Sequence, residues 1–323
     1  MRLGFAVVAL VGGCGEVADP NKLPDAPLQQ DGATADADVD APIDSPPPRC
    51  DPSKPFGAPE LVAEITTTGA SNSDTSPWLT EDELSLYFAS NRAGGVGSFD
   101  IYLSTRADRT AAWGAPAIVA GVNTTGPEQR PTLTGDGLTM YAVIEPVGSP
   151  STNPTIGVAT RASTSASFGA LTPVTILNDA DIDASPYVLP DHSALYMVSR
   201  RGGANNIQIY RAARSGDMFS APALVTGTML DVFDAHATAV PTPDELTLYF
   251  GSDRGGNYDV WVATRASQAV GFGAPVAVTE LNSTTPDIPY WVSADQCVIY
   301  LTKQAMAPTG APISRIARAV RPL

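Results

Sequence analysis

The sequence is poor in basic residues, histidine and cysteine, and each scarcity excludes a class of function. Only 19 Lys and Arg residues face 34 Asp and Glu residues, giving a formal net charge of -15. Such a surface repels phosphate backbones and anionic lipid head groups, so we expect no nucleic-acid partner and no direct adsorption to a membrane. The 2 His and 3 Cys residues are too few and too scattered for a usual zinc site.

Long helical patterns and common enzyme motifs are also missing. No long stretch keeps an apolar repeat of about 3.6 residues, which argues against a helical protein. Neither a G-x-S-x-G nucleophile elbow nor a P-loop is present. By contrast, 28 Gly and 29 Pro residues suit many short strands joined by tight turns. The composition therefore predicts an all-β protein.

The N-terminus carries a short apolar run. Arg2 precedes residues 3–11, which are too few to span a bilayer and typical of a secretory signal peptide. The following Gly12-Gly13-Cys14 resembles the end of a bacterial lipobox, so we expect a signal peptide at residues 1–13 and lipidation of Cys14. An ordinary signal peptide with an incidental cysteine is the alternative. The lipid would be the only membrane attachment, in the periplasm or at the cell surface.

Residues 14–54 are expected to form an acidic, disordered linker. They are rich in Asp and Pro and nearly devoid of large apolar side chains, so they cannot bury enough surface to fold alone. The acidic run at residues 36–40 lacks the Gly and distal Glu of a calcium loop. The remaining Cys50 and Cys297 could form a disulfide in an oxidising compartment, or stay as two unpaired thiols.

The rest of the chain, residues 55–323, repeats itself. Residues 84–106 return almost intact at 246–265, and a weaker copy occupies 195–211. A strand tyrosine recurs every 51 to 55 residues, at Tyr87, Tyr141, Tyr196, Tyr249 and Tyr300. An aromatic-Gly-Ala-Pro phrase recurs with it, beginning at Phe56, Trp113, Phe168 (without the Pro), Phe219 (with Ser for Gly) and Phe272. This period, with strand signals alone, predicts a β-propeller, because β-solenoid coils are much shorter.

Each period holds four strand candidates, which in the first copy are residues 76–80, 84–90, 99–105 and 117–121. Residues 56–64 look like a fourth strand without the three before it. Residues 313–320 look like a third strand without a fourth. The two ends should therefore complete one blade, which leaves no exposed edge. The sequence predicts a five-bladed β-propeller of four-stranded antiparallel blades, closed by the N-terminal strand.

The repeat also carries a family likeness. The run LYFASNRAGG…FDIYLSTR, followed by Trp113-Gly-Ala-Pro, residues 121–131 and Gly135-Asp136-Gly137, resembles the WD40-like propeller repeat of bacterial TolB-type and OmpA-associated periplasmic proteins. The resemblance implies an extracytoplasmic binding or scaffolding module. The second blade departs from the pattern, because residues 143–156 replace the Arg-Gly-Gly turn. No peptidoglycan-binding domain follows, which weighs against tethering to the cell wall.

An acidic residue precedes each first strand and forms the candidate ligand-binding set, to which His236 is added: Asp74, Glu128, Asp183, Asp234 and Asp287. Since first strands are innermost, these carboxylates are expected at the mouth of the central channel. They could hold a ligand or a cation such as Ca²⁺, the one cofactor considered. Alternatively, they could cap turns or pair with arginines, which would make them structural.

A second set belongs to the Arg-Gly-Gly turns. We expect arginines on one side of the hairpin to clamp aspartates on the other. These structural residues are Arg92, Asp100, Arg201, Arg254 and Asp259. His192, after Pro190-Asp191, is expected to be exposed and inert.

Aromatic residues on or beside the inner strands could stack on sugars or simply fill space between blades. They are Trp78, Tyr187 and Trp291. The favoured function is a monomeric, non-catalytic module that binds a protein or glycan on one propeller face. The alternatives are a glycan hydrolase that uses the channel carboxylates, and a calcium-stabilised adhesion module.

Overall fold

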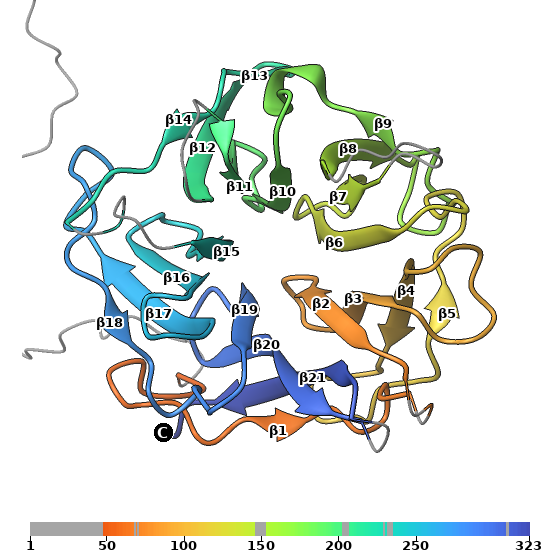
Figure 1. Ribbon diagram of the computed structural model, residues 1–323, viewed down its shortest axis with the longest axis horizontal. Coiled ribbons are helices and arrows are strands. Elements are labelled where there is room, and N and C mark those ends of the chain that lie inside the picture. The colour runs from red at the N-terminus through yellow and green to blue at the C-terminus, as the bar shows by residue number, and fades with distance from the viewer. Residues whose placement is uncertain are drawn as a thin grey trace, which may run out of the picture. The chain divides into compact units, whose positions relative to one another are not determined.

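Five antiparallel sheets form a ring in the computed structural model, with one strand of each facing the centre (Figure 1). The structure describes residues 48–67, 69, 71–145, 153–201, 207–228, 230, 235–307 and 310–323. The predicted signal peptide, Cys14 and the linker up to residue 47 lie outside these residues. Pro48–Leu323 is one compact unit. The predicted five-bladed β-propeller is confirmed.

The first two blades each contain four strands in sequence order from the centre outward. Blade 1 consists of β2 (Asp74–Leu79), β3 (Ser85–Ser90), β4 (Asp100–Thr105) and β5 (Ala117–Ile118). Blade 2 consists of β6 (Glu128–Leu133), β7 (Thr139–Ile144), β8 (Thr155–Thr160) and β9 (Thr172–Pro173). The outermost strands have only 2 residues each, which limits the exposed edge of each sheet.

Blades 3 and 4 repeat this order with one addition. Blade 3 consists of β10 (Asp183–Val188), β11 (Ala194–Ser199), β12 (Gln208–Ser215) and β14 (Ala223–Leu224), and β13 (Met218–Phe219) pairs with the end of β12. Blade 4 consists of β15 (His236–Pro241), β16 (Thr247–Ser252), β17 (Asp259–Thr264) and β18 (Val276–Ala277). The one helical turn of the described residues is η1 (Thr175–Leu177). No helix in the described part of the chain could cross a membrane.

The fifth blade joins the two ends of the chain. It consists of β19 (Asp287–Val292), β20 (Val298–Met306), β21 (Pro312–Val320) and the N-terminal β1 (Glu60–Leu61). Strand β1 lies antiparallel beside β21, with Glu60 opposite Arg318, and Figure 1 shows the two strands side by side. The Gly57 N–H also donates to the Val320 carbonyl at 2.9 Å. The predicted closure is therefore confirmed.

A disulfide and an arginine reinforce this closure. Cys50 and Cys297 form a disulfide, the first of the two alternatives left open by the sequence. Arg49 donates two hydrogen bonds to Asp295 of blade 5, at 2.7 and 2.9 Å, and pairs with Glu83 of blade 1 at 2.6 Å. Residues 48–54, which the sequence assigned to the linker, therefore belong to the compact unit.

The aromatic-Gly-Ala-Pro phrase has a structural cause. In four blades an arginine after the third strand lies over the ring of that aromatic residue: Arg106 on Trp113, Arg161 on Phe168, Arg265 on Phe272 and Arg321 on Phe56, at 3.9 to 4.5 Å from the ring centre. The Nε of each arginine donates to a carbonyl of the first-to-second turn: Glu83, Gly137, Glu245 and Gln296. This cation–π contact ties the outer strand to the inner turn of the same blade.

The recurring strand tyrosines lie at the junctions between blades. Three of their hydroxyls meet a side chain of the next blade's first turn: Tyr141 with His192 at 2.8 Å, Tyr196 with Glu245 at 2.6 Å and Tyr249 with Gln296 at 3.0 Å. Tyr87 instead accepts from Arg161 at 3.4 Å, because Gly137 has no side chain. The fifth, Tyr300, has no hydrogen-bond partner in the described residues, since the turn residue Glu83 pairs with Arg49, Arg106 and Arg109.

Candidate functional site: the central channel

The acidic residues that begin the inner strands point into their own blades. Asp74 accepts from Arg92 and Ser90, both at 2.7 Å, and its side chain is fully buried. Asp183 accepts from Arg201 at 2.6 Å and from the backbone N–H of Asp179 at 2.6 Å. None of the described residues that line the channel is one of these acids. Their position favours the structural alternative over a carboxylate ring at the channel mouth.

The other two described acids are buried in the same way. Asp287 accepts from Lys303 and from the backbone and hydroxyl of Ser283. Glu128 accepts from the backbone and hydroxyl of Thr124 and has no cationic partner among the described residues. Burial raises the pKa of Glu128, the hydrogen bonds from Thr124 oppose the rise, and the nearby Asp100 adds to it.

Blade 4 departs from the predicted pattern. Its inner strand begins at His236, which takes the place that an acidic residue holds in the other blades. His236 is fully buried, its Nε2 lies 2.9 Å from the Leu230 carbonyl, and its ring packs edge-on against Phe250. A role for His236 as a ligand-binding residue of the channel is not supported by this burial. Asp234 lies outside the described residues.

The arginine clamps exist, but the partner differs from the predicted one. Arg92 pairs with Asp74 on the inner strand and lies 5.0 Å from the ring centres of both Phe88 and Tyr102. Asp100 instead accepts from the backbone N–H groups of Val96 and Gly97, at 3.0 and 3.2 Å, and so caps the turn. The predicted Arg92–Asp100 pair is wrong: Asp74 and Asp100 both lie opposite Ser90, and the guanidinium turns toward Asp74 on the inner strand.

The other two turn arginines occupy corresponding positions. Arg201 pairs with Asp183 and lies 5.2 Å from the ring centre of Tyr210. Arg254 lies over Phe250 and Trp261, and its Nε donates to Ser252 at 3.3 Å. Burial raises the pKa of Asp259, and the charge of Asp287 adds to the rise. These contacts lie within the blades, but neither Arg92 nor Arg201 pairs with an aspartate on the third strand, although the sequence predicted such pairs for these turns.

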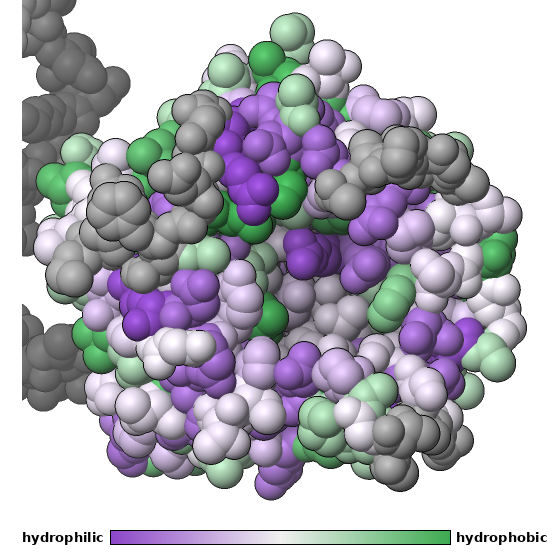
Figure 2. All heavy atoms as spheres, viewed as in Figure 1, coloured by the Kyte–Doolittle hydropathy of each residue, from purple (hydrophilic) through white to green (hydrophobic). Residues whose placement is uncertain are grey.

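Every inner strand contributes at least one residue to the lining of the central channel. These residues include Trp78 of β2, Arg130 of β6, Ser185 and Tyr187 of β10, Thr238 of β15 and Tyr290 of β19. Figure 2 shows the hollow at the centre of the ring, with hydrophilic residues on its rim. The space between these side chains is narrow, with room for about one water.

Bulges in the inner strands set this lining. All five inner strands shift register against the second strand, for example between Gln129 and Thr132. Three of the bulge residues have a positive φ, namely Ser76 (56°), Arg130 (56°) and Ser185 (49°). Bulges redirect side chains, which explains how Arg130 and Ser185, two positions after Glu128 and Asp183, turn into the channel. Arg130 is the charged member of this set.

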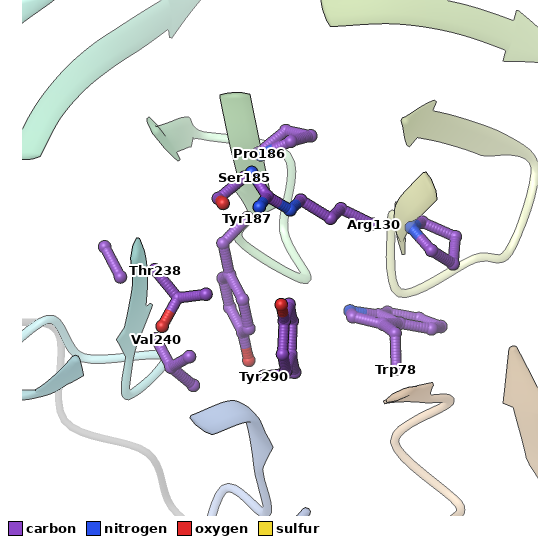
Figure 3. Close-up of a pocket in the computed structure, with 10 residues that line it drawn as sticks. Trp78, Arg130, Ser185, Pro186, Tyr187, Thr238, Val240 and Tyr290 are labelled. Atoms are coloured by element: carbon purple, nitrogen blue, oxygen red, sulfur yellow. The ribbon is translucent and has the colours of Figure 1, made fainter. Parts of the chain in front are cut away.

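Arg130 makes no hydrogen bond or ion pair with any described residue, although it is half-buried. It extends from β6 across the channel toward β10 (Figure 3). The charge of Arg130 also affects Tyr258 of blade 4. Burial and Asp253 raise the pKa of Tyr258, and Arg130 acts against that rise. The sequence analysis missed Arg130, although its offset of two residues from Glu128 could have indicated it.

The aromatic residues of the inner strands fill space rather than form a platform. Trp78, Tyr187 and Trp291 are 5%, 8% and 5% exposed, so their faces are covered. Trp78 packs against Tyr87, and Trp291 against Tyr300, with ring centres 6.2 and 6.0 Å apart. This packing favours the second of the two predicted roles, which is filling the gap between blades.

His192 is neither exposed nor isolated, so that prediction is wrong. Its Nε2 lies 2.8 Å from the Tyr141 hydroxyl, and its ring packs edge-on against Phe219. Burial lowers the pKa of His192, and Arg214 acts in the same direction. The sequence placed it in a turn, but the neighbouring blade covers that turn.

No group of three or more His, Cys, Asp or Glu side chains in the described part of the chain is placed to hold a metal ion. The calcium site proposed from the sequence stays a prediction. The buried carboxylates that suggested it are already bonded to residues of their own blades.

The comparisons with known proteins define the class by fold. No protein-family model matches the sequence, and a search of curated proteins gave no match. Among solved structures, Zg3597, a family 117 glycoside hydrolase from Zobellia galactanivorans, is 13% identical with a TM-score of 0.53, over 83% of this chain and 90% of that one. RS223-Beta-xylosidase is 12% identical with a TM-score of 0.52, over 82% and 98%.

A further similarity is to TolB from Acinetobacter baumannii, at 19% identity and a TM-score of 0.47. It covers 77% of this chain, which spans about half (54%) of the TolB chain. At these identities the likeness extends to the fold and not to the activity. The protein is thus a five-bladed β-propeller, a class whose members carry different functions on one scaffold.

Proposed function

We propose that this protein is an extracytoplasmic propeller that binds a protein or glycan ligand at its channel face without chemical turnover. The observation that carries the proposal is the burial of the inner-strand carboxylates. Asp74, Asp183 and Asp287 are each bonded to a cation of their own blade. A carboxylate held this way cannot approach a substrate, whereas Arg130 and Tyr290 on two of the same strands stay partly exposed at the channel.

The second candidate is a glycan hydrolase, the activity named for two of the similar structures. Hydrolysis needs two carboxyl groups facing the substrate, about 5 to 9.5 Å apart. Among the described residues that line the channel, the one carboxylate is Glu81, at the end away from Arg130. A lone carboxylate does not provide the acid and the nucleophile or base, so binding is the stronger hypothesis.

The proposed location is outside the cytoplasm, with the mature chain anchored by lipid on Cys14. The disulfide between Cys50 and Cys297 supports an oxidising compartment. The acidic residues 14–47 would then separate the propeller from the membrane surface. Labelling with radioactive palmitate, compared between the wild type and Cys14→Ser, tests the anchor.

The proposal is tested with the purified full chain against a panel of polysaccharides and envelope proteins. Retention and product release are measured in parallel on each member of the panel. We expect retention of at least one polymer with no release of reducing sugar or peptide. Product release that is lost in Asp183→Asn or Glu128→Gln, while circular dichroism is unchanged, would replace binding with hydrolysis. Retention of no member would contradict the proposal.

A further inference from the structure

Arg130 places a cation at the channel, and none of the described residues beside it supplies a counter-charge. No described residue that lines the Arg130 end of the channel carries a carboxylate, and the guanidinium of Arg130 bonds to no described side chain or carbonyl. A half-buried guanidinium in a narrow space is poorly solvated, so a bound anion is favoured there. Arginine presents planar, paired N–H groups that match the two oxygens of a carboxylate.

One hydroxyl group extends this donor set from another blade. The Tyr290 ring of β19 stands in the channel on the Trp78 side, and Figure 3 shows its oxygen at the end of the ring nearer Arg130. The Thr238 hydroxyl of β15 is buried and turned toward β16, where it accepts the Gly251 N–H at 3.3 Å, so it does not face Arg130 (Figure 3). The Ser185 hydroxyl already donates to the Ala237 carbonyl at 2.6 Å. Arg130 and Tyr290 thus offer donors from two blades.

The size of the channel limits the ligand. The interior of the channel has room for about one water, so a carboxylate can meet the partly exposed Arg130 only at the channel mouth, and the aromatic walls Trp78 and Tyr187 are covered. A sugar ring has no open aromatic face to stack on. The net charge of -15 also repels a polyanion at long range. These limits favour one carboxylate on a flexible stem, flanked by neutral groups.

We propose that Arg130 is the anchor for a single carboxylate, an Asp or Glu side chain of a protein ligand that reaches the channel mouth from the face of the second-to-third loops. This inference rests on the proposed binding function and names the ligand chemistry of that same site. The Tyr290 hydroxyl of β19 donates to the same carboxylate. The aromatic walls exclude water and strengthen the ion pair.

The test uses the full chain and unlabelled peptides in ligand-observed saturation-transfer NMR. The probe is a Gly-Ser peptide with blocked ends and one central Glu, and the matched control peptide carries Gln. We expect the Glu peptide to bind about 10- to 100-fold more tightly than the Gln peptide, and Arg130→Gln to abolish that difference. Arg130→Lys should retain part of it, since the charge remains without the planar pair of donors.

Two further variants make the result specific. Tyr290→Phe removes one hydroxyl and should weaken binding of the Glu peptide by about 5-fold. Arg109→Gln changes an arginine whose side chain is 45% exposed and lies outside the channel, and should have no effect. Circular dichroism confirms that each variant is folded.

Three outcomes would overturn the inference. The first is equal binding of the Glu and Gln peptides, the second is equal binding of the Glu peptide to the wild type and Arg130→Gln, and the third is no binding below about 10 mM. Tighter binding of digalacturonate than of the Glu peptide would reject a protein ligand in favour of an acidic glycan. A polymer retained by the wild type and by Arg130→Gln alike would leave the binding function standing and remove only this inference.

Discussion

Five tyrosine hydroxyls occupy equivalent positions between blades, but their partners differ from junction to junction. Tyr196 donates to Glu245, which also binds Arg211 at 2.6 Å. Burial raises the pKa of Tyr196, and Glu245 adds to the rise. Tyr300 lies near Trp113 and Arg318 but has no hydrogen bond of good geometry. The repeat therefore conserves the ring of the tyrosine more strictly than the use of its hydroxyl.

This difference predicts opposite results for one chemical change. Tyr196→Phe should lower the free energy of unfolding by about 1.5 to 3 kcal/mol, because a buried bond to a charged group is lost. Tyr300→Phe should cause no loss, because an unpaired buried hydroxyl is removed. Urea unfolding measures the free energy of unfolding of both variants. Equal losses would contradict the difference in hydrogen bonding between Tyr196 and Tyr300.

The inner-strand acids allow a second comparison. Asp183→Asn should cost about 3 to 5 kcal/mol of stability, because Arg201 loses the charge of its partner. Glu128→Gln should cost less than about 1 kcal/mol, since burial already favours the neutral form of Glu128. Thermal unfolding at neutral pH distinguishes them. A larger loss in Glu128→Gln would mean that its charge has a structural role.

At the scale of elements, the short N-terminal strand depends on contacts around it. Strand β1 has only 2 residues, but Phe56 stacks under Arg321 at 3.9 Å and the Asp51 N–H donates to the Pro322 carbonyl at 2.9 Å. Cys50 and Cys297, which are 247 residues apart, then connect the segment covalently to blade 5. The closure is thus held by several weak contacts and one covalent bond.

Removing the covalent bond should destabilise the whole ring. In the chain-entropy description, a loop this long contributes about 5 kcal/mol, so the double variant Cys50→Ala/Cys297→Ala should unfold at markedly lower urea concentration. Reduction of the wild type should have the same effect, and reductant should not change the double variant. An unchanged midpoint after verified reduction would show that the non-covalent contacts close the ring by themselves.

At the scale of the whole molecule, ion pairs at the blade turns make stability depend on pH. Burial alone would raise the pKa of Asp295, but hydrogen bonds from Arg49, Ser293 and the Cys297 N–H outweigh it and lower the pKa to about 2. Burial acts likewise on Glu245, whose pKa is lowered by Arg211 and Tyr196. A lowered pKa in the folded state stabilises the protein above the unfolded value and is lost on acidification.

We therefore expect the free energy of unfolding to fall as the pH drops from 4.5, the ordinary value of Glu245, to about 2. Glu128 contributes in the opposite direction. Its raised pKa stabilises the folded state below pH 4.5, and this contribution is lost as the pH rises through the pKa of Glu128 in the folded state. Urea midpoints across pH measure both effects. Asp295→Asn should flatten the acid branch, and Glu128→Gln should remove the decline above 4.5. An unchanged acid branch in Asp295→Asn would contradict this account.

The repeat was enough to predict the blade count and the closure, because strand periodicity and turn residues are local properties. It placed the strands of blade 1 within about two residues of those observed, apart from the shorter β5. It could not predict which way a side chain at a strand end turns. Arg130 lies two residues after Glu128, which is the blade 2 equivalent of Asp74. The acid at the strand start points into its blade and Arg130 points into the channel, because the bulge of the inner strand lies between these positions.

The order of residues in the chain determined that five equivalent units form and that the two ends share one of them, since each unit repeats the same alternation and turns. Only the tertiary structure decided which residues face the channel and which charges pair there. Those outcomes depend on side chains brought together from strands more than fifty residues apart, such as Arg130 and Tyr290, and no local pattern records that proximity.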